Sequence, residues 1–171
     1  MSRLHRQTCP IAASLNILGD NWTLLIVREA FYGVTRFKDF QANTGIAKNL
    51  LSSRLSQLVE SGIIGKKDIG THGSRHEYHL TQKGRALTPV MVALSQWGNE
   101  WVFGDGNEPV QLLDAQSGKP IMPLSPRSPD GDQLDWRDIV MRVGPGANGP
   151  MRERFAKLEN DAQSRNSNSP K

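Results

Sequence analysis

The clearest pattern of hydrogen-bonding side chains in this sequence lies between residues 48 and 57. On a helical wheel the opposite sector is apolar, and the polar sector holds only amides and small hydroxyls, from Asn49, Ser52, Ser53, Ser56 and Gln57. Small polar groups let a helix backbone approach base edges in the major groove of DNA, while an apolar sector holds the helix on its domain. Lys48, at the boundary, can reach a phosphate or a base edge. The segment therefore predicts a helix that reads DNA.

The positive charge of the chain is concentrated around this helix. Residues 36–85 contain nine Lys or Arg and four Asp or Glu, a local excess of +5, whereas the remaining residues sum to −1 of the net +4. A concentrated positive surface attracts polyanions, and nucleic acid is the abundant polyanion of the cytoplasm. A solvated basic surface without a partner is the common alternative. Arg36 and Lys38 belong to this basic region and are further candidates for DNA contact.

Arg54 is a DNA residue by type, but its place on the helical wheel is beside the apolar sector. Two interpretations follow from that position. Its guanidinium contacts a phosphate, or its stem packs on the domain and the guanidinium pairs with a carboxylate.

Three short helices precede the candidate helix and must position it. The first opens at Cys9 and Pro10 and stops at Gly19, and the second is capped by Asp20 and ends at Gly33. This second helix is apolar on most sides, which predicts the buried centre of the fold. A third helix, about residues 36–44, ends near Gly45, so that a tight turn leads into the candidate helix.

After Gly62 the pattern changes to a two-stranded hairpin. A β-branched run beginning at Ile63 is followed by a polar tip with glycines and then by HEYHL, in which apolar and polar residues alternate. Thr81 can cap a following helix over 82–102, which must be kinked by Pro89 or start late enough to hold Pro89 in its first turn. This order predicts an α+β winged helix-turn-helix. The tip residues expected to touch DNA are Thr71, His72, Ser74 and Arg75.

Beyond residue 103 the composition shifts toward glycine and proline with short alternating runs such as VQLLD, KPIMP and DIVMRV. These runs predict a small β-rich C-terminal extension over residues 104–160, with one short helix behind Pro150. Residues 161–171 are too polar to pack, which predicts a disordered tail. The expected domains are therefore 1–103, 104–160 and the tail.

Composition excludes several classes of protein. At 171 residues the chain holds one well-cored domain and an appendage, and it has no apolar run long enough for a membrane span or a signal peptide, so we expect a cytoplasmic protein without a membrane partner. No nucleophile elbow, phosphate loop or metal-spaced carboxylates occur, which argues against an enzyme. His72, His76 and His79 lack the arrangement of a metal site, and we expect no metal and no cofactor.

Cys9 is the only cysteine in the chain, which excludes an internal disulfide framework. Its place at a helix N-terminus, with Arg3, His5 and Arg6 nearby in sequence, can lower its pKa and make the thiol reactive. The alternative is a small buried side chain that only packs.

Five segments, in this order, carry a resemblance to a known family: CPI at 9–11, LGDNWTLLIVREAFYG, TRFKDFQANTGIAKNLLSSRLSQLVESGII, HEYHLTQKGRAL and LSQWG. Together they resemble HxlR-type winged helix-turn-helix regulators, relatives of the MarR group, over about residues 9–101. The resemblance implies a bacterial transcription regulator that binds double-stranded DNA as a homodimer through the first and last long helices. In some members of this family the cysteine at the position of Cys9 senses oxidants or electrophiles, and the resemblance therefore implies such a role for Cys9. The expected dimer residues are Ile11, Leu15, Leu87, Met91, Leu94, Trp97 and Trp101.

A homodimer with two-fold symmetry predicts an inverted-repeat operator. Two other functions stay open at this point. One is a winged-helix protein-interaction module, which would carry acidic substitutions on the 48–57 face and the hairpin, and these are absent. The other is a regulator that responds to a small molecule bound by the 104–160 extension.

Overall fold

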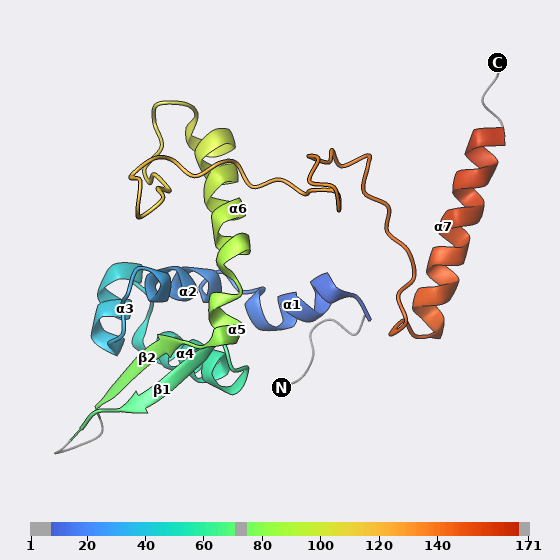
Figure 1. Ribbon diagram of the computed structural model, residues 1–171. Helices are drawn as coiled ribbons and strands as arrows, with labels where there is room; N and C mark the ends of the chain where they lie inside the picture. Colours follow the sequence, from blue (N-terminus) through green and yellow to red (C-terminus); the bar gives the residue numbers. More distant parts are fainter. Residues whose placement is uncertain (1–7, 71–74, 168–171) are drawn as a thin grey trace. The chain divides into compact units, whose positions relative to one another are not determined.

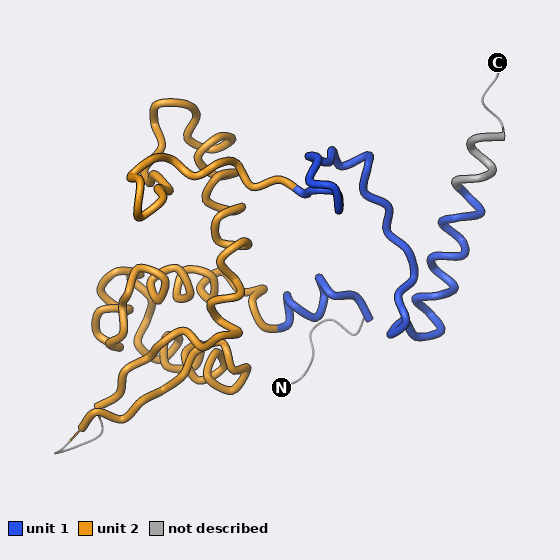
Figure 2. Tube along the Cα trace, viewed as in Figure 1, with its two compact units in different colours: residues 1–16, 126–171 blue, residues 17–125 orange. Residues whose placement is uncertain are grey.

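The computed structural model describes residues 8–70 and 75–167, with side chains through residue 161. It divides into two compact units, one of residues 17–125 and the other of residues 1–16 with 126–171 (Figure 2). Each unit is described by itself. Thr71, His72 and Ser74 of the predicted hairpin tip lie outside the described residues, as do Arg3, His5 and Arg6.

The unit of residues 17–125, orange in Figure 2, is a winged helix-turn-helix, as predicted (Figure 1). Three helices, α2 (Thr23–Phe31), α3 (Phe37–Thr44) and α4 (Lys48–Glu60), precede the antiparallel strands β1 (Ile64–Asp68) and β2 (His76–Leu80). The register places Ile64 opposite Leu80 and Asp68 opposite His76. The segment before α3 joins the other edge of β2, because the N–H of Tyr78 donates to the carbonyl of Thr35 at 2.8 Å.

The hairpin of β1 and β2 is the wing of the fold. The hydrophobic core lies between the three helices and the start of this wing. The central position predicted for α2 agrees with the structure, since Ile26 and Val27 are fully buried. Tyr78 of β2 meets the ring of Phe40 edge-on, with centroids 6.3 Å apart. The complete cluster of buried residues is Ile26, Val27, Phe40, Ile46, Leu51, Leu55, Leu58, Ile63 and Ile64.

Local sequence signals set the helix ends. Asp20 accepts hydrogen bonds from the N–H groups of Trp22 (2.9 Å) and Thr23 (3.2 Å), so it caps α2 although the helix itself begins at Thr23. Gly45 ends α3 with φ of 70°, a left-handed conformation that favours glycine. The hydroxyl of Thr81 accepts from the N–H of Gly84 at 3.1 Å and caps the next helix, as expected.

The helix expected over 82–102 is divided into three parts. A short α5 (Gln82–Arg85) is followed by α6 (Thr88–Gly98), and the π-helical turn η1 (Asn99–Phe103) continues from α6. Pro89 lies in the first turn of α6, where a missing N–H costs no helical hydrogen bond. The second of the two placements considered for Pro89 is therefore the one observed.

Residues 104–125 belong to the same compact unit as the winged helix. The side chain of Gln96 in α6 donates to the carbonyl of Met122 (3.1 Å) and accepts from the N–H of Leu124 (2.8 Å). Asn99 donates to the carbonyl of Val110 at 2.8 Å. These bonds attach the segment to α6, a contact that residue patterns near position 103 did not indicate.

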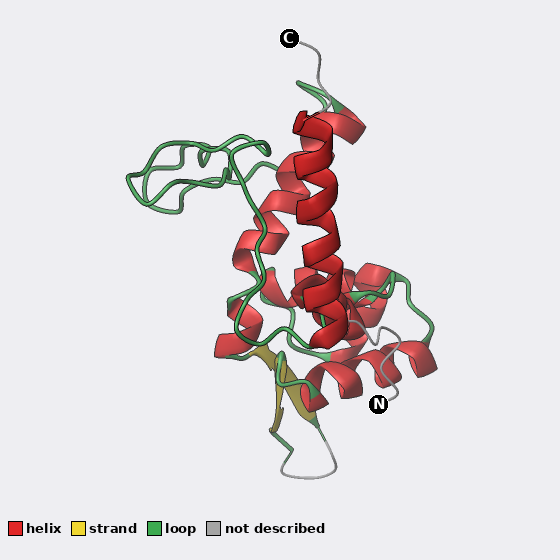
Figure 3. Cartoon of the chain, turned by 90° about the vertical axis from the view of Figure 1, so that its right-hand side faces the viewer, coloured by secondary structure: helices red, strands yellow, loops and turns green. Residues whose placement is uncertain are grey.

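The prediction of a β-rich extension is wrong. All of residues 104–148 are described, and they contain isolated bridges at Leu113–Pro120 and Arg127–Gln133 but no strand (Figure 3). Six of the ten prolines of the chain fall in this segment, and each removes a backbone donor that a ladder needs. The short alternating runs are therefore loops.

The unit of residues 1–16 and 126–171, blue in Figure 2, contains α7 (Gly149–Ser167) and most of α1 (Pro10–Leu18). Asn148 donates to the hydroxyl of Thr8 at 2.6 Å and accepts from the N–H of Met151, which caps α7. The helix reaches Ser167, so residues 161–167, expected in a disordered tail, are helical. Among the residues that the structure describes, no single helix is long and apolar enough to cross a membrane, and α1 with α2 passes that test only as a pair bent by 79°.

Candidate nucleic-acid interface

The two faces of α4 separate as the helical wheel predicts. Leu51, Leu55 and Leu58 are at most 1% exposed and fix the helix on the core. The opposite face is open to solvent at Lys48, Asn49, Ser52, Ser53 and Ser56, with Gln57 half-buried at its edge. Small side chains leave the backbone of this face accessible, which is the shape that a major groove admits. Contact of these residues with DNA stays a prediction.

Basic side chains flank α4 on neighbouring elements. Arg36 and Lys38, at the start of α3, are exposed, and so is Arg75 before β2, whose carbonyl accepts from the N–H of Ile69 at 2.8 Å. Lys66 and Lys67 on β1 are also exposed. These two lysines were not among the predicted DNA residues, although the Lys-Lys pair at the end of a β-branched run was a signal that could have identified them.

Arg54 pairs with a carboxylate. Its Nε lies 3.1 Å from Oδ1 of Asp20, and its Nη1 donates to Oε1 of Gln57 at 2.9 Å. The side chains of Arg54 and Asp20 are 24% and 29% exposed. This is the second of the two interpretations of Arg54 from sequence, and its partner belongs to the loop between α1 and α2.

The environment of Asp20 favours its charged form. Partial burial acts to raise the pKa of this carboxyl, but hydrogen bonds from the Thr23 hydroxyl and the N–H groups of Trp22 and Thr23, together with the charge of Arg54, outweigh burial. The net result is a lowered pKa for Asp20. The carboxylate that holds Arg54 is therefore ionised at neutral pH.

A second ion pair lies within α2, and a hydrogen bond connects it to α3. Glu29 of α2 is 4% exposed, and its carboxylate accepts from Arg28 at 2.7 Å and from Asn43 of α3 at 2.8 Å. A buried carboxylate needs such partners, because an unpaired buried charge is strongly destabilising. The bond from Asn43 thus fixes α3 against α2.

The predicted dimer residues on and next to α6, from Leu87 to Trp101 in η1, fall into two groups. Leu87 and Met91 are partly buried and pack on the core of their own subunit. Leu94, Trp97 and Trp101 are 47%, 59% and 69% exposed. The accessible part of the stripe is therefore its C-terminal half. In the other unit, Ile11 and Leu15 of α1 are 69% and 44% exposed.

Cys9 is a half-buried free thiol just before α1. Hydrogen bonds from the backbone N–H groups of Ala12 and Ile11 lower its pKa, burial acts in the opposite direction, and the charge of Arg154 in α7 lowers it further. The helix N-terminus therefore favours the thiolate, as expected from sequence.

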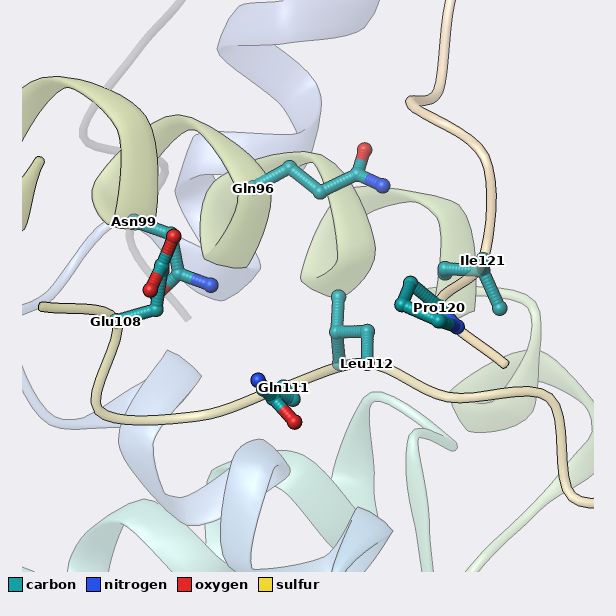
Figure 4. A pocket seen from close by; sticks show the side chains of 7 residues that line it. All are labelled: Gln96, Asn99, Glu108, Gln111, Leu112, Pro120 and Ile121. Atoms are coloured by element: carbon teal, nitrogen blue, oxygen red, sulfur yellow. The ribbon is translucent and has the colours of Figure 1, made fainter. Parts of the chain in front are cut away.

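A small pocket lies between α6 and the segment that follows it (Figure 4). It has a volume of about 210 Å³ and is lined by Gln96, Asn99, Glu108, Gln111, Leu112, Pro120 and Ile121. Gln96 and Asn99 are occupied by their bonds to residues 110, 122 and 124. In the described part of the chain, no group of three or more His, Cys, Asp or Glu side chains is placed to hold a metal ion.

The sequence and the fold match known proteins. Residues 17–105 match the HxlR-like helix-turn-helix family. Rv3095 of Mycobacterium tuberculosis, named as an uncharacterized HTH-type transcriptional regulator, is 38% identical over 136 residues, covering 80% of this chain and 86% of the relative.

Two solved structures share both fold and sequence. PA1607, a proposed transcription factor, is 44% identical with a TM-score of 0.73, and the match covers 82% of this chain and 96% of that one. PA1374 of Pseudomonas aeruginosa, also a proposed transcription factor, is 34% identical with a TM-score of 0.62, covering 85% and 99%. Both matches cover more of the chain than residues 17–105.

Proposed function

The chain belongs to the HxlR-like helix-turn-helix family of transcriptional regulators, which are not enzymes, and from this we propose that it binds an inverted-repeat operator in double-stranded DNA as a homodimer. The observation that carries the proposal is the division of α4 into a buried leucine face and an exposed face of Lys48, Asn49 and small hydroxyls. A recognition helix needs both faces, one for its domain and one for base edges.

The proposal divides the basic and polar residues by role. Asn49, Ser52, Ser53, Ser56 and Gln57 face the groove and specify sequence, while Arg36, Lys38, Lys48 and the wing contact phosphates and position the protein. The wing contribution comes from Arg75 with the tip residues Thr71, His72 and Ser74. The exposure of Arg75 and of the α3 cations supports this division.

The homodimer is supported by the apolar residues that a single copy leaves in water. Leu94 and Trp97 on α6, Trp101 on η1, and Ile11 and Leu15 on α1 are large and at least 44% exposed. Aromatic side chains of this kind anchor protein interfaces when a partner buries them. Two recognition helices related by a two-fold axis then read half-sites about one helical turn, or a multiple of it, apart.

Regulation through Cys9 is the finer part of the proposal. Its thiolate attacks a peroxide oxygen, which gives a sulfenic acid and releases water or an alcohol, or it adds covalently to an electrophile. The sulfenic acid can condense with Cys9 of the second copy to a disulfide, with loss of water. The lowered pKa of the thiol supports this step. Because Cys9 precedes a proposed dimer helix, modification changes the spacing of the recognition helices.

Selection of bound fragments from the source genome, followed by binding titrations at several salt concentrations, tests the main proposal. We expect a palindromic footprint and an affinity that falls steeply with salt, because phosphate contacts release counterions. Arg75→Ala should weaken binding to all duplexes alike, whereas Asn49→Ala should change the preference among them. A flat salt response, or a single asymmetric half-site, would contradict the proposal.

Cys9→Ser is the control for the redox part. This variant should bind the operator as tightly as the parent and keep that affinity in peroxide, while the parent changes affinity once mass spectrometry shows complete modification. Equal affinity of the parent before and after modification would leave Cys9 a packing residue.

The pocket of Figure 4 supports a second mode of regulation, by a small molecule held between α6 and residues 108–121. Because α6 also carries the proposed dimer surface, a ligand there could alter dimer geometry. Thermal-shift screening of small metabolites with the parent and with Glu108→Gln as a control tests this mode. A hit that stabilises the parent and not the variant is the expected result.

A further inference from the structure

The unit of residues 1–16 and 126–171 has almost no core of its own. Among the side chains described for this unit, only Ala12 is buried. Burial of apolar surface is the main driving force of folding, so a unit that buries a single alanine lacks that source of stability. Four of its large apolar side chains, here called the arm patch, lie instead in water, with exposed fractions of 74%, 45%, 72% and 78%: Trp136, Ile139, Val140 and Met141.

Hydrogen bonds fix the backbone on both sides of the arm patch. Before the patch, the N–H of Leu134 donates to the carbonyl of Pro126 at 2.9 Å. After it, Asn148 joins the start of α7 to Thr8 at 2.6 Å. Within the part of the chain that the structure describes, the backbone of residues 139–143 makes no hydrogen bond. The patch therefore combines exposed apolar side chains with free backbone donors and acceptors.

The size of the arm patch suits a protein interface. Three consecutive large apolar residues in water are typical of an interaction surface. At about 250 Å² for a tryptophan and about 120 Å² for an aliphatic side chain, the patch leaves roughly 400 Å² uncovered. Two patches related by a two-fold axis bring roughly 800 Å², and the surfaces that they cover bring a similar area. Together they match the total of about 1,600 Å² in a standard interface.

Charge and attachment favour a second copy of this chain as the partner. Residues 126–161 contain six Lys or Arg and seven Asp or Glu, so this segment has no positive excess to attract DNA. The segment is joined through Asn148 to Thr8, just before α1. Ile11 and Leu15 of α1 are exposed members of the proposed dimer surface. The arm patch thus belongs to the same unit as a proposed dimer helix.

We propose that the arm patch docks on a second copy of this chain, so that the homodimer is held by two C-terminal segments as well as by α1 and α6. The inference rests on the proposed function, because it takes the homodimer from it. It names a contact outside residues 17–105, which are the residues that match the family. The free N–H and C=O groups of residues 139–143 find their partners on the second copy, since a buried backbone needs such partners.

Amide hydrogen exchange of the full-length parent tests the contact without any substitution. Exchange is measured above and below the dimer dissociation constant, which sedimentation velocity supplies. The amides of residues 139–143 should exchange at least about tenfold more slowly in the dimer, because only there are they covered. Equal protection in monomer and dimer would mean that the patch packs on its own subunit. No protection in the dimer would mean that the patch stays in water, and either result overturns the proposal.

Substitution tests the same contact by affinity. Trp136→Ala combined with Met141→Ala should raise the dimer dissociation constant by roughly tenfold or more, because an aromatic anchor is lost. Tyr32→Ala is the matched control, since it removes an aromatic side chain that is 60% exposed at the end of α2, and it should leave the constant unchanged. Thermal melts of the dilute monomers establish that both variants fold. An unchanged constant in the double variant, or an equal increase in Tyr32→Ala, overturns the proposal.

Failure of the arm contact is distinguishable from failure of the proposed function. A parent that stays monomeric at every concentration contradicts the homodimer itself. A dimer weakened by Trp97→Ala but not by the double variant leaves the homodimer and DNA binding in place and removes only the arm contact. Operator affinity of the double variant should return to that of the parent once concentration restores the dimer. A loss that persists would mark the patch as a DNA contact and overturn the proposal.

Discussion

Helices α4 and α6 belong to the same unit, and both carry an apolar stripe at helical spacing, but the stripes end in opposite environments. On α4 the residues Leu51, Leu55 and Leu58 are at most 1% exposed. On α6 no residue is fully buried; Leu94 and Trp97 are 47% and 59% exposed, and Trp101 in the following turn η1 is 69% exposed. The difference teaches that helical periodicity identifies a face that needs a partner and does not identify the partner. The partner of α4 is its own domain, and we propose a second copy as the partner of α6.

The largest expected difference comes from making the same substitution on both helices. Leu55→Ala should lower the free energy of unfolding by about 2–5 kcal/mol, because it leaves a cavity in a closed core. Leu94→Ala should change the unfolding of a dilute, monomeric sample by no more than about 0.5 kcal/mol, since its side chain is 47% exposed. Urea unfolding followed by circular dichroism measures both free energies. Similar losses of unfolding free energy in the two variants would contradict the difference between α4 and α6.

Helix α5, which lies between β2 and α6, should tolerate little change at Gly84. A Cβ on Gly84 of α5 would lie 2.2 Å from the carbonyl oxygen of Ile63, the residue that follows the α4 turn. We expect Gly84→Ala to destabilise the fold by about 1–3 kcal/mol through overpacking against backbone. Gly98→Ala, in α6 with no atom within 4 Å of the added carbon, is the matched control and should be neutral or slightly stabilising. Thermal melts that rank the two variants in the reverse order would contradict this assignment.

The exposed stripe of α6 should matter for association rather than for folding. Trp97→Ala is expected to weaken the homodimer by roughly tenfold or more, because a buried aromatic anchor is lost from the interface. Sedimentation velocity over a range of concentrations measures the dissociation constant, and the far-ultraviolet spectrum and melt of the monomer should be unchanged. A dimer as tight as that of the parent would remove α6 from the proposed interface.

The smallest expected effect is the pH dependence due to Asp20. Because the pKa of Asp20 is lowered in the folded state, the folded protein binds fewer protons at this carboxyl than the unfolded chain does. The carboxylate therefore adds to the free energy of unfolding above the ordinary carboxyl pKa, and this addition is lost as the pH falls through the pKa of the folded state. For a partly exposed ion pair this amounts to about 1 kcal/mol or less. Urea unfolding of the parent and Asp20→Asn at pH 7 and near pH 3 should show the difference between them shrinking in acid. A difference that grows in acid would have the wrong sign.

Local signals were sufficient to predict the winged helix-turn-helix. Proline at the start of α1, the left-handed glycine after α3 and the Thr81 cap of α5 each act within a few residues, so the sequence contains both partners. The two faces of α4 follow from the helical period alone. The DNA contacts proposed for that face remain predictions, since the fold shows exposure and not a ligand.

The contacts that sequence patterns did not indicate are those between residues far apart in the chain. Asp20 and Arg54 are separated by 34 positions, and neither has a local pattern that identifies the other as its partner. Gln96 holds the backbone at 122 and 124, although amides on a helix surface are common and most face solvent. The alternating runs after residue 103 suggested strands, but alternation predicts a strand only where a second strand can pair with it.

The sequence by itself determined that α2, α3 and α4 form, about where they end and which side of α4 is polar, because these depend on dihedral preferences, capping and periodicity over a few residues. Only the tertiary structure decided that Arg54 pairs with Asp20 and donates to Gln57, that Leu87 and Met91 face the core while Trp97 and Trp101 do not, and that residues 104–125 dock on α6. The physical reason is that a side chain's partner is chosen by distance in space, and packing brings together groups whose separation along the chain carries no signal.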